Sequence, residues 1–157
     1  MSKITVRQAI ELFNAISKMK DAGIFVKGLK NIDLAMNKAA VQPIVDGYKI
    51  ASETPSQYLK YLEKLEELKL KGSNGSNGFD NPKQMYEDLQ ELKKQYTDAI
   101  QEYEDWKQSM KTILDEEREV TLIMISKEDL KIAEDNGASP DVLYGLLPCI
   151  KEVNHSE

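Results

Sequence analysis

The stretch "KGSNGSNGFDNP", residues 71–82, decides how this chain folds, because it separates two regions of strong helical periodicity. Its glycines, Gly72, Gly75 and Gly78, recur at every third position. A phosphate-binding glycine loop follows a strand and leads into a helix through Gly-Lys-Ser/Thr, whereas here a helical pattern precedes the glycines. The tandem GSN composition is typical of a flexible spacer. We therefore expect a flexible tip over 72–81, with the helices on either side packed antiparallel.

The region after the tip predicts one long helix over 82–117. Asn81 is placed to cap it and Pro82 to open it. Apolar residues then alternate steps of four and three, which is the heptad signature of a coiled coil. These residues are Met85, Leu89, Leu92, Tyr96, Ala99, Tyr103, Trp106, Met110 and Ile113.

The region before the tip predicts a kinked or broken helix over 29–71. Apolar residues recur at helical spacing from Leu29, and Pro43 then removes a backbone donor, so we expect a kink or break there. Thr54 and Pro55 form a restart signal. The second half carries an apolar stripe of Tyr58, Tyr61, Leu62, Leu65 and Leu68.

The two ends of the chain predict shorter elements. Thr5 and Gln8 form a capping box for a helix over 5–20. The alternation after residue 118 predicts an extended arm over 119–125, with short helices following at 126–134 and 140–147. We expect a single all-α domain over 1–153, built on a long antiparallel, coiled-coil-like helical hairpin. The N-terminal helix, arm and short helices pack along it, and residues 154–157 form a disordered tail.

Composition limits the class of protein. A chain of 157 residues with 41% hydrophobic and 31% charged residues is typical of one folded domain. No apolar run approaches the roughly 20 residues that cross a bilayer, and no signal-peptide pattern opens the chain, so we expect a cytoplasmic setting without membrane partners.

The charge is unevenly distributed. Residues 1–52 carry eight Lys or Arg against four Asp or Glu, a net charge of +4, and residues 53–157 carry thirteen against twenty-three, a net charge of −10. The basic part lacks an arginine cluster with interleaved aromatic residues, so nucleic acid is an unlikely partner. The asymmetry favours contacts within the fold or between copies.

Residues for catalysis are scarce. The only histidine, His155, lies near the chain end, and the only cysteine, Cys149, has neither a second cysteine nor an ordered histidine for a zinc or nucleophilic site. Acidic residues such as Asp115 and Glu116 lie off the apolar stripe, where water solvates them. The sequence therefore predicts no enzyme activity, no cofactor and no metal.

Two features are candidates for binding a partner. Aromatic residues gather on the predicted hairpin helices and form either its core or a groove for a partner: Tyr58, Tyr61, Tyr96, Tyr103 and Trp106. The arm carries Leu122 and Met124, and it either packs internally or adds a strand to another chain.

The order of these parts resembles a group of small tailed-bacteriophage proteins whose function is largely unassigned. The resemblance rests on "ITVRQAIELFNAI", a helical hairpin with a polar tip, "DEEREV" running into "TLIMI", then "SKEDL" and "SPDVLYGLLP". It covers nearly the whole chain and implies a viral, non-enzymatic accessory protein. Neither Pro43 nor the "GSNGSNG" tip belongs to that pattern.

We therefore expect a non-enzymatic phage accessory protein that binds other proteins or copies of itself, as a virion component or assembly factor, in the host cytoplasm or the virion. The alternative is an anti-defence inhibitor that sequesters a host protein or a signalling nucleotide, with Arg7, Lys27 and Lys30 supplying charge. A third hypothesis is a carboxylate-dependent metal hydrolase.

Overall fold

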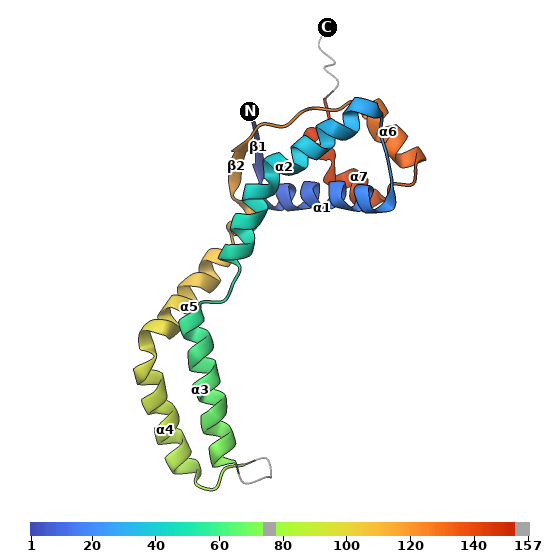
Figure 1. The fold of residues 1–157 in the computed structure, drawn as a ribbon. Helices are drawn as coiled ribbons and strands as arrows, with labels where there is room; N and C mark the ends of the chain where they lie inside the picture. The colour runs from blue at the N-terminus through green and yellow to red at the C-terminus, as the bar shows by residue number, and fades with distance from the viewer. Residues whose placement is uncertain (74–77, 153–157) are drawn as a thin grey trace. The chain divides into compact units, whose positions relative to one another are not determined.

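The computed structural model describes residues 1–73 and 78–152, and these form mainly α-helices (Figure 1). The predicted all-α class with a helical hairpin is confirmed. The chain divides into two compact units, one made of Met1–Ala51 and the segment from Thr112 onward, the other of Ser52–Lys111. Two compact units need not be independent folding domains, so the single domain expected over 1–153 stays a prediction.

The first unit is built around α1 (Val6–Ala22) and α2 (Gly28–Ala51), which pack against each other (Figure 1). The predicted capping box is present, because the Gln8 amide donates to the Thr5 side chain and the Thr5 amide donates to Gln8 Oε1. Gly23 ends α1 with φ of 66°, a left-handed conformation that glycine adopts without strain. The local signals around α1 thus work as the sequence predicts.

Short C-terminal elements complete the first unit. They are α6 (Lys127–Asp135), α7 (Pro140–Gly145) and a 3₁₀ turn, η2 (Leu147–Cys149). Ser126 and Ser139 cap α6 and α7, as predicted. Helix α7 packs on α1 so closely that a Cβ at Gly145 would lie 2.7 Å from the Glu11 carbonyl oxygen. Only glycine fits this contact between the two helices.

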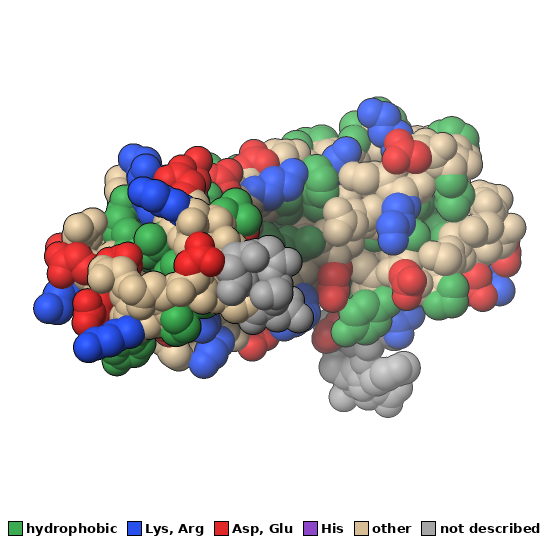
Figure 2. All heavy atoms as spheres, turned by 90° about the horizontal axis from the view of Figure 1, so that it is seen from below, with side chains coloured by type: hydrophobic (Ala, Val, Ile, Leu, Met, Phe, Trp, Pro, Cys, Tyr) green, Lys and Arg blue, Asp and Glu red, His purple; other side chains and the backbone are tan. Residues whose placement is uncertain are grey.

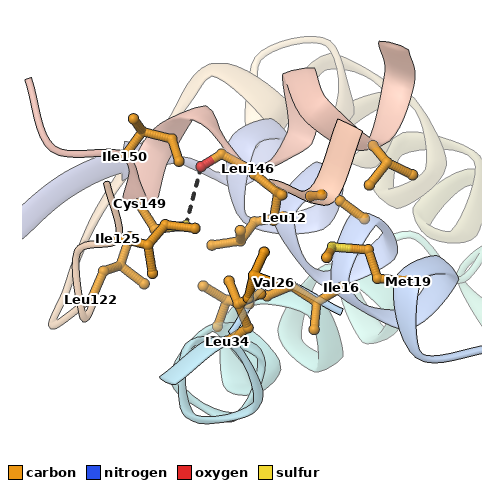
Figure 3. Close-up of a cluster of buried hydrophobic side chains, with 14 of the residues drawn as sticks. Leu12, Ile16, Met19, Val26, Leu34, Leu122, Ile125, Leu146, Cys149 and Ile150 are labelled. Carbon is orange, nitrogen blue, oxygen red and sulfur yellow. Dashed lines mark hydrogen bonds between the residues drawn. The ribbon is translucent and has the colours of Figure 1, made fainter. Parts of the chain in front are cut away.

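The core of the first unit lies between α1, α2 and the C-terminal segment (Figure 3). Its fully buried side chains include Leu12, Val41, Ile125 and Leu146. Figure 3 shows side chains from these segments converging on Leu12, with Cys149 Sγ donating to the Leu146 carbonyl at 3.1 Å. Residues from both ends of the chain therefore share one apolar core.

The unit also contains a short antiparallel sheet that the sequence did not predict. Strand β1 (Ser2–Thr5) pairs with β2 (Glu117–Val120), and Ser2 lies opposite Val120. The arm expected over 119–125 therefore begins as a strand at residue 117. Beyond Val120 the chain stays mostly irregular, with a single parallel bridge between Ile125 and Ile150.

The second unit is the predicted antiparallel hairpin. Helix α3 (Ser56–Gly72) packs against α4 (Pro82–Gln95) and α5 (Thr97–Met110) (Figure 1). Asn81 caps α4 by accepting from the Gln84 amide, as predicted. We predicted a flexible tip over 72–81, and its residues 74–77 lie outside the described part of the chain. The tail predicted to be disordered, 154–157, lies wholly outside it.

The single helix predicted over 82–117 is interrupted and shorter. Tyr96, with φ of −112° and ψ of 24°, separates α4 from α5, and the Thr97 hydroxyl bonds the carbonyls of Lys93 and Lys94. Such side-chain bonds compete with the helical ladder. After Met110 a turn and a 3₁₀ helix, η1 (Ile113–Asp115), follow, because the chain then pairs with β1. Tertiary pairing here overrides helix propensity.

The region predicted as kinked or broken over 29–71 does form two helices, but the break is not at Pro43. Helix α2 continues through Pro43, and the chain leaves helical geometry only at Ser52. Pro43 is exposed, while the opposite side of α2 is held by buried Leu34, Val41 and Val45. Packing of that side offsets the lost backbone donor.

Candidate functional site

The predicted aromatic residues form a continuous cluster inside the hairpin. Tyr58 of α3 and Tyr103 of α5 stack with ring centroids 3.7 Å apart and planes 2° from parallel. Tyr61 lies 5.7 Å from Tyr96, and Tyr103 lies 5.6 Å from Trp106, both measured between ring centroids. The structure thus brings all five predicted aromatic residues together, and they join the helices of the hairpin to each other.

The pKa of the Tyr58 phenol is raised within this cluster. Partial burial raises the pKa of Tyr58, and the neighbouring phenol of Tyr103 raises that pKa further. Both causes favour the neutral hydroxyl at physiological pH. The cluster therefore has the character of an internal packing contact, and an additional role in binding a partner stays a prediction.

The predicted arm residues are engaged inside the first unit. Leu122 is buried in the core, and Met124 packs against that core. The backbone of Ile125 is also paired, since its amide donates to the Cys149 carbonyl at 2.8 Å and its carbonyl accepts from the Lys151 amide at 2.8 Å. Of the two alternatives for the arm, the structure has the internal one.

A buried asparagine fixes the middle of the arm. The Asn37 side chain of α2 is fully buried, and its Nδ2 donates to the Ile123 carbonyl at 2.8 Å. The Ile123 amide donates back to Asn37 Oδ1 at 2.7 Å. The side-chain amide therefore pairs with the arm as a neighbouring strand would.

Two further buried side chains, Asp129 and Cys149, have structural surroundings. The Asp129 carboxylate accepts from the Ser126 amide and hydroxyl, and Lys27 Nζ lies 4.0 Å from it. Burial raises the pKa of Cys149 to about 11, so its thiol stays protonated and unreactive at neutral pH. These groups have the surroundings of structural rather than reacting residues.

The cations proposed for a nucleotide site each have an acidic neighbour. Arg7 lies 3.6 Å from Asp115, and Lys30 lies 3.6 Å from Asp33. On the face drawn in Figure 2, Lys and Arg side chains are interspersed with Asp and Glu side chains. Neither observation favours a concentrated anion-binding site.

The described residues contain neither a group of metal-ligating side chains nor a helix suited to span a membrane. In the part of the chain that the structure describes, His, Cys, Asp and Glu form no group that could hold a metal ion. Across residues 1–73 and 78–152, no helix combines the length and apolarity that a membrane span requires.

The most distinctive surface lies on α2. This helix has two apolar sides: the inner side carries buried Leu34, Val41 and Val45, and the other side faces solvent. We call the second side the outer α2 face and define it by six exposed residues: Leu29, Ile32, Ala35, Met36, Ala39 and Pro43. Leu29 is 78% exposed, Ile32 56% and Met36 55%. Exposed apolar residues gathered on one side of a helix make this face a candidate contact surface.

A hollow adjoins the outer α2 face. It has a volume of about 250 Å³ and lies between α1 and α2, next to Phe25, which is 61% exposed. Its walls are mainly apolar, with two lysines at its margin: Ile16, Met19, Lys20, Ile24, Phe25, Asn31, Leu34, Ala35 and Lys38. The hollow widens the apolar surface toward α1.

Sequence reasoning missed the outer α2 face, although a signal for it exists. The helical pattern that starts at Leu29 includes Ile32 and Met36 and was read as one apolar stripe. The second apolar stripe of the same helix was not recognised. At 3.6 residues per turn, Leu34, Val41 and Val45 fall on the opposite side of the same helix. A single neighbouring element can cover only one side of a helix, so a helix with two apolar sides leaves one of them exposed.

Comparisons with known proteins add no relative. No protein-family model matches the chain, and neither a curated protein nor a solved structure matches it.

Proposed function

We propose that this protein is a non-enzymatic bacteriophage accessory protein that works through protein–protein contacts, and that the outer α2 face makes the contact. The observation that carries the proposal is the exposure of Leu29, Ile32 and Met36 on a helix whose other side is already packed. Water contact with this surface is unfavourable, and a protein partner would remove it.

The resemblance in sequence order to small tailed-bacteriophage proteins supports the viral part of the proposal. A virion component or an assembly factor would use such a face to join a larger assembly, in the host cytoplasm or the virion. The same face also suits the alternative, an anti-defence inhibitor that sequesters a host protein. The nucleotide-binding form of that alternative has less support, because Arg7, Lys27 and Lys30 all have acidic neighbours.

Purification of the wild-type protein beside two variants tests the proposal. The double variant Ile32→Glu/Met36→Glu charges the outer α2 face, and Leu59→Glu charges an exposed leucine in the hairpin as a matched control. Light scattering gives the copy number, and mass spectrometry quantifies any companion protein. We expect the wild type and the control to keep a stoichiometric companion, either another copy or another protein, and the double variant to lose it.

A wild-type protein that is monomeric and has no stoichiometric companion would contradict the proposal. A companion that the double variant retains in full would place the contact elsewhere on the surface. Circular dichroism of the double variant confirms that lost binding is not lost folding.

A further inference from the structure

We propose that the hollow between α1 and α2 binds a small amphipathic carboxylate, whose apolar body lies in the hollow and whose charged end lies at its margin. This site is separate from the contact proposed above, because Leu29, Ile32 and Met36 do not line the hollow. Four properties of the hollow support this ligand: an apolar floor, a wall fixed by hydrogen bonds, a margin of donors without acids, and a volume that fits such a molecule.

The floor of the hollow is apolar. Ile16 and Met19 of α1 and Leu34 of α2 line it, and each is at most 6% exposed (Figure 3). Phe25, 61% exposed, adds an aromatic side chain to the lining. Water inside such a hollow finds few hydrogen-bond partners, so an apolar group that displaces it binds favourably. The unbranched thioether side chain of Met19 can adapt to the shape of that group.

The wall between α1 and α2, residues 24–27, is fixed by the protein itself. Three hydrogen bonds hold it: the Ile24 amide to the Met19 carbonyl at 2.9 Å, the Val26 amide to Asn31 Oδ1 at 3.0 Å, and Asn136 Nδ2 to the Phe25 carbonyl at 2.7 Å. A wall that is already fixed reduces the ordering cost of binding. The hollow is therefore preformed, as small-molecule sites usually are.

Two lysines supply positive charge at the margin of the hollow. Lys20 of α1 and Lys38 of α2 line it, and no Asp or Glu does. Asp21 follows Lys20 in the sequence, but successive residues of a helix do not face each other. Within residues 1–73 and 78–152, neither lysine forms an ion pair. A carboxylate at this margin would form charge-assisted hydrogen bonds with cations that no described acid neutralises.

Asn31 adds a neutral donor that is already oriented. Its Oδ1 accepts from the Val26 amide, which leaves Nδ2 as a donor without a partner among the described residues. A carboxylate accepts hydrogen bonds and donates none, so its chemistry matches a margin of two ammonium groups and one amide. The charge of two lysines suits one carboxylate better than the several negative charges of a polyphosphate.

The volume of the hollow sets the size of the ligand. A volume of about 250 Å³ corresponds to about eight groups the size of a water molecule, at roughly 30 Å³ each. An unbranched carboxylate of about eight carbon atoms, such as octanoate, has an apolar body of this size. With about ten non-hydrogen atoms, we expect octanoate to bind with a Kd on the order of 0.1–1 mM.

Titration of the ¹⁵N-labelled wild-type protein with octanoate tests the proposal by nuclear magnetic resonance. We expect saturable shifts of amide signals that are confined to residues around the hollow, Ile24, Phe25 and Ala35 among them. Octylammonium has a tail of the same length and the opposite charge. It should bind at least about tenfold more weakly, because it meets the two lysines as a like charge.

Variants separate the charged margin from the apolar lining. Lys20→Gln/Lys38→Gln should weaken octanoate binding at least about tenfold and change the binding of uncharged octanol by less than about twofold. Lys3→Gln/Lys18→Gln is the matched control, because it removes the same charge from exposed lysines outside the lining, and it should change octanoate binding by less than about twofold. Phe25→Ala should weaken both ligands at least about threefold, because both lose apolar contact.

The opposite results would overturn the inference. No saturable shift at about ten times the expected Kd would show that the hollow does not bind a carboxylate. Octylammonium binding as tight as octanoate binding, or an equal loss in the lysine control, would show that the lysines of the margin do not select the charge. Shifts spread over the whole surface would show non-specific binding. The comparison of octanoate with octylammonium needs only the wild type, so it decides the matter even if a variant fails to fold.

Discussion

Replacing Asn37 by alanine tests whether one side chain holds the arm in place. The Asn37 amide is fully buried and makes two hydrogen bonds with the backbone of Ile123, at 2.8 and 2.7 Å. These bonds join residues 86 positions apart in the chain. Asn37→Ala removes both bonds and leaves the Ile123 amide and carbonyl without these partners.

The expected loss of stability follows from the burial of the Ile123 amide and carbonyl, which lose their partners. A buried donor or acceptor left without a partner costs about 1–3 kcal/mol, so two such groups cost about 2–6 kcal/mol. Ile123 is only half-buried, and both of its bonds to Asn37 are part-buried, which favours the lower part of that range. We expect a loss of about 2–4 kcal/mol in the free energy of unfolding, a large share of the 5–15 kcal/mol typical of a folded protein.

Urea denaturation followed by circular dichroism measures this loss, and hydrogen exchange at the Ile123 amide locates it. Asn14→Ala is the matched control, because Asn14 is an exposed asparagine on α1, and its replacement should change stability by less than about 0.5 kcal/mol. A loss below about 1 kcal/mol, with the Ile123 amide still protected from exchange, would refute the reasoning.

Three further predictions concern packing and protonation. Gly145→Ala should destabilise the protein by about 1–3 kcal/mol, because its Cβ would meet the backbone of α1. Gly47→Ala, in open space on α2, should stabilise it by about 0.5–1 kcal/mol. Melting temperatures that shift in the same direction for both variants would contradict this prediction. The pKa of Cys149 is raised from 9.0 to about 11, so above pH 9 the unfolded chain loses this proton before the folded one. The free energy of unfolding should therefore be unaffected below pH 9 and fall by about 2–3 kcal/mol toward pH 11, and urea titrations of Cys149→Ala should lack this part of the fall. Tyr103→Ala should lower the hairpin's stability by about 2 kcal/mol through loss of the stack, while exposed Tyr86→Ala should cost less than about 0.5 kcal/mol; equal losses would show that the stack contributes nothing.

The parts of the fold that depend on neighbouring residues could be predicted from the sequence. The caps at Thr5, Asn81 and Ser126 each act within three residues, and all three are present. The antiparallel hairpin follows from two apolar stripes joined by a short polar segment.

The predictions that were wrong concern structure that is decided by distant residues or by competing hydrogen bonds. Pairing of Ser2 with Val120 joins residues that are far apart in the chain, and the local sequence of neither strand identifies the strand it pairs with. Pro43 remains inside α2 because packing on the opposite side holds the helix. The heptad pattern through Tyr96 shows which side of the helix is apolar, and it does not report the Thr97 hydroxyl bonds.

The outer α2 face could be predicted only in part. The apolar residues of α2 are visible in the sequence, but which of its two sides meets α1 is decided by the tertiary structure. The inner side packs on α1 through Leu34 and Val41, and this packing leaves Leu29 and Ile32 in solvent.

The division of the first unit between two chain segments affects how the protein is made. Its core needs Leu12 from the first segment and Ile125 and Leu146 from the second, and the whole hairpin is translated after the first segment and before the second. At about 5–20 residues per second, a ribosome takes several seconds to cross that insertion. During this delay the side of α1 that packs on α7 lacks its cover, so we expect the nascent chain to expose apolar surface to chaperones until the C-terminal helices emerge.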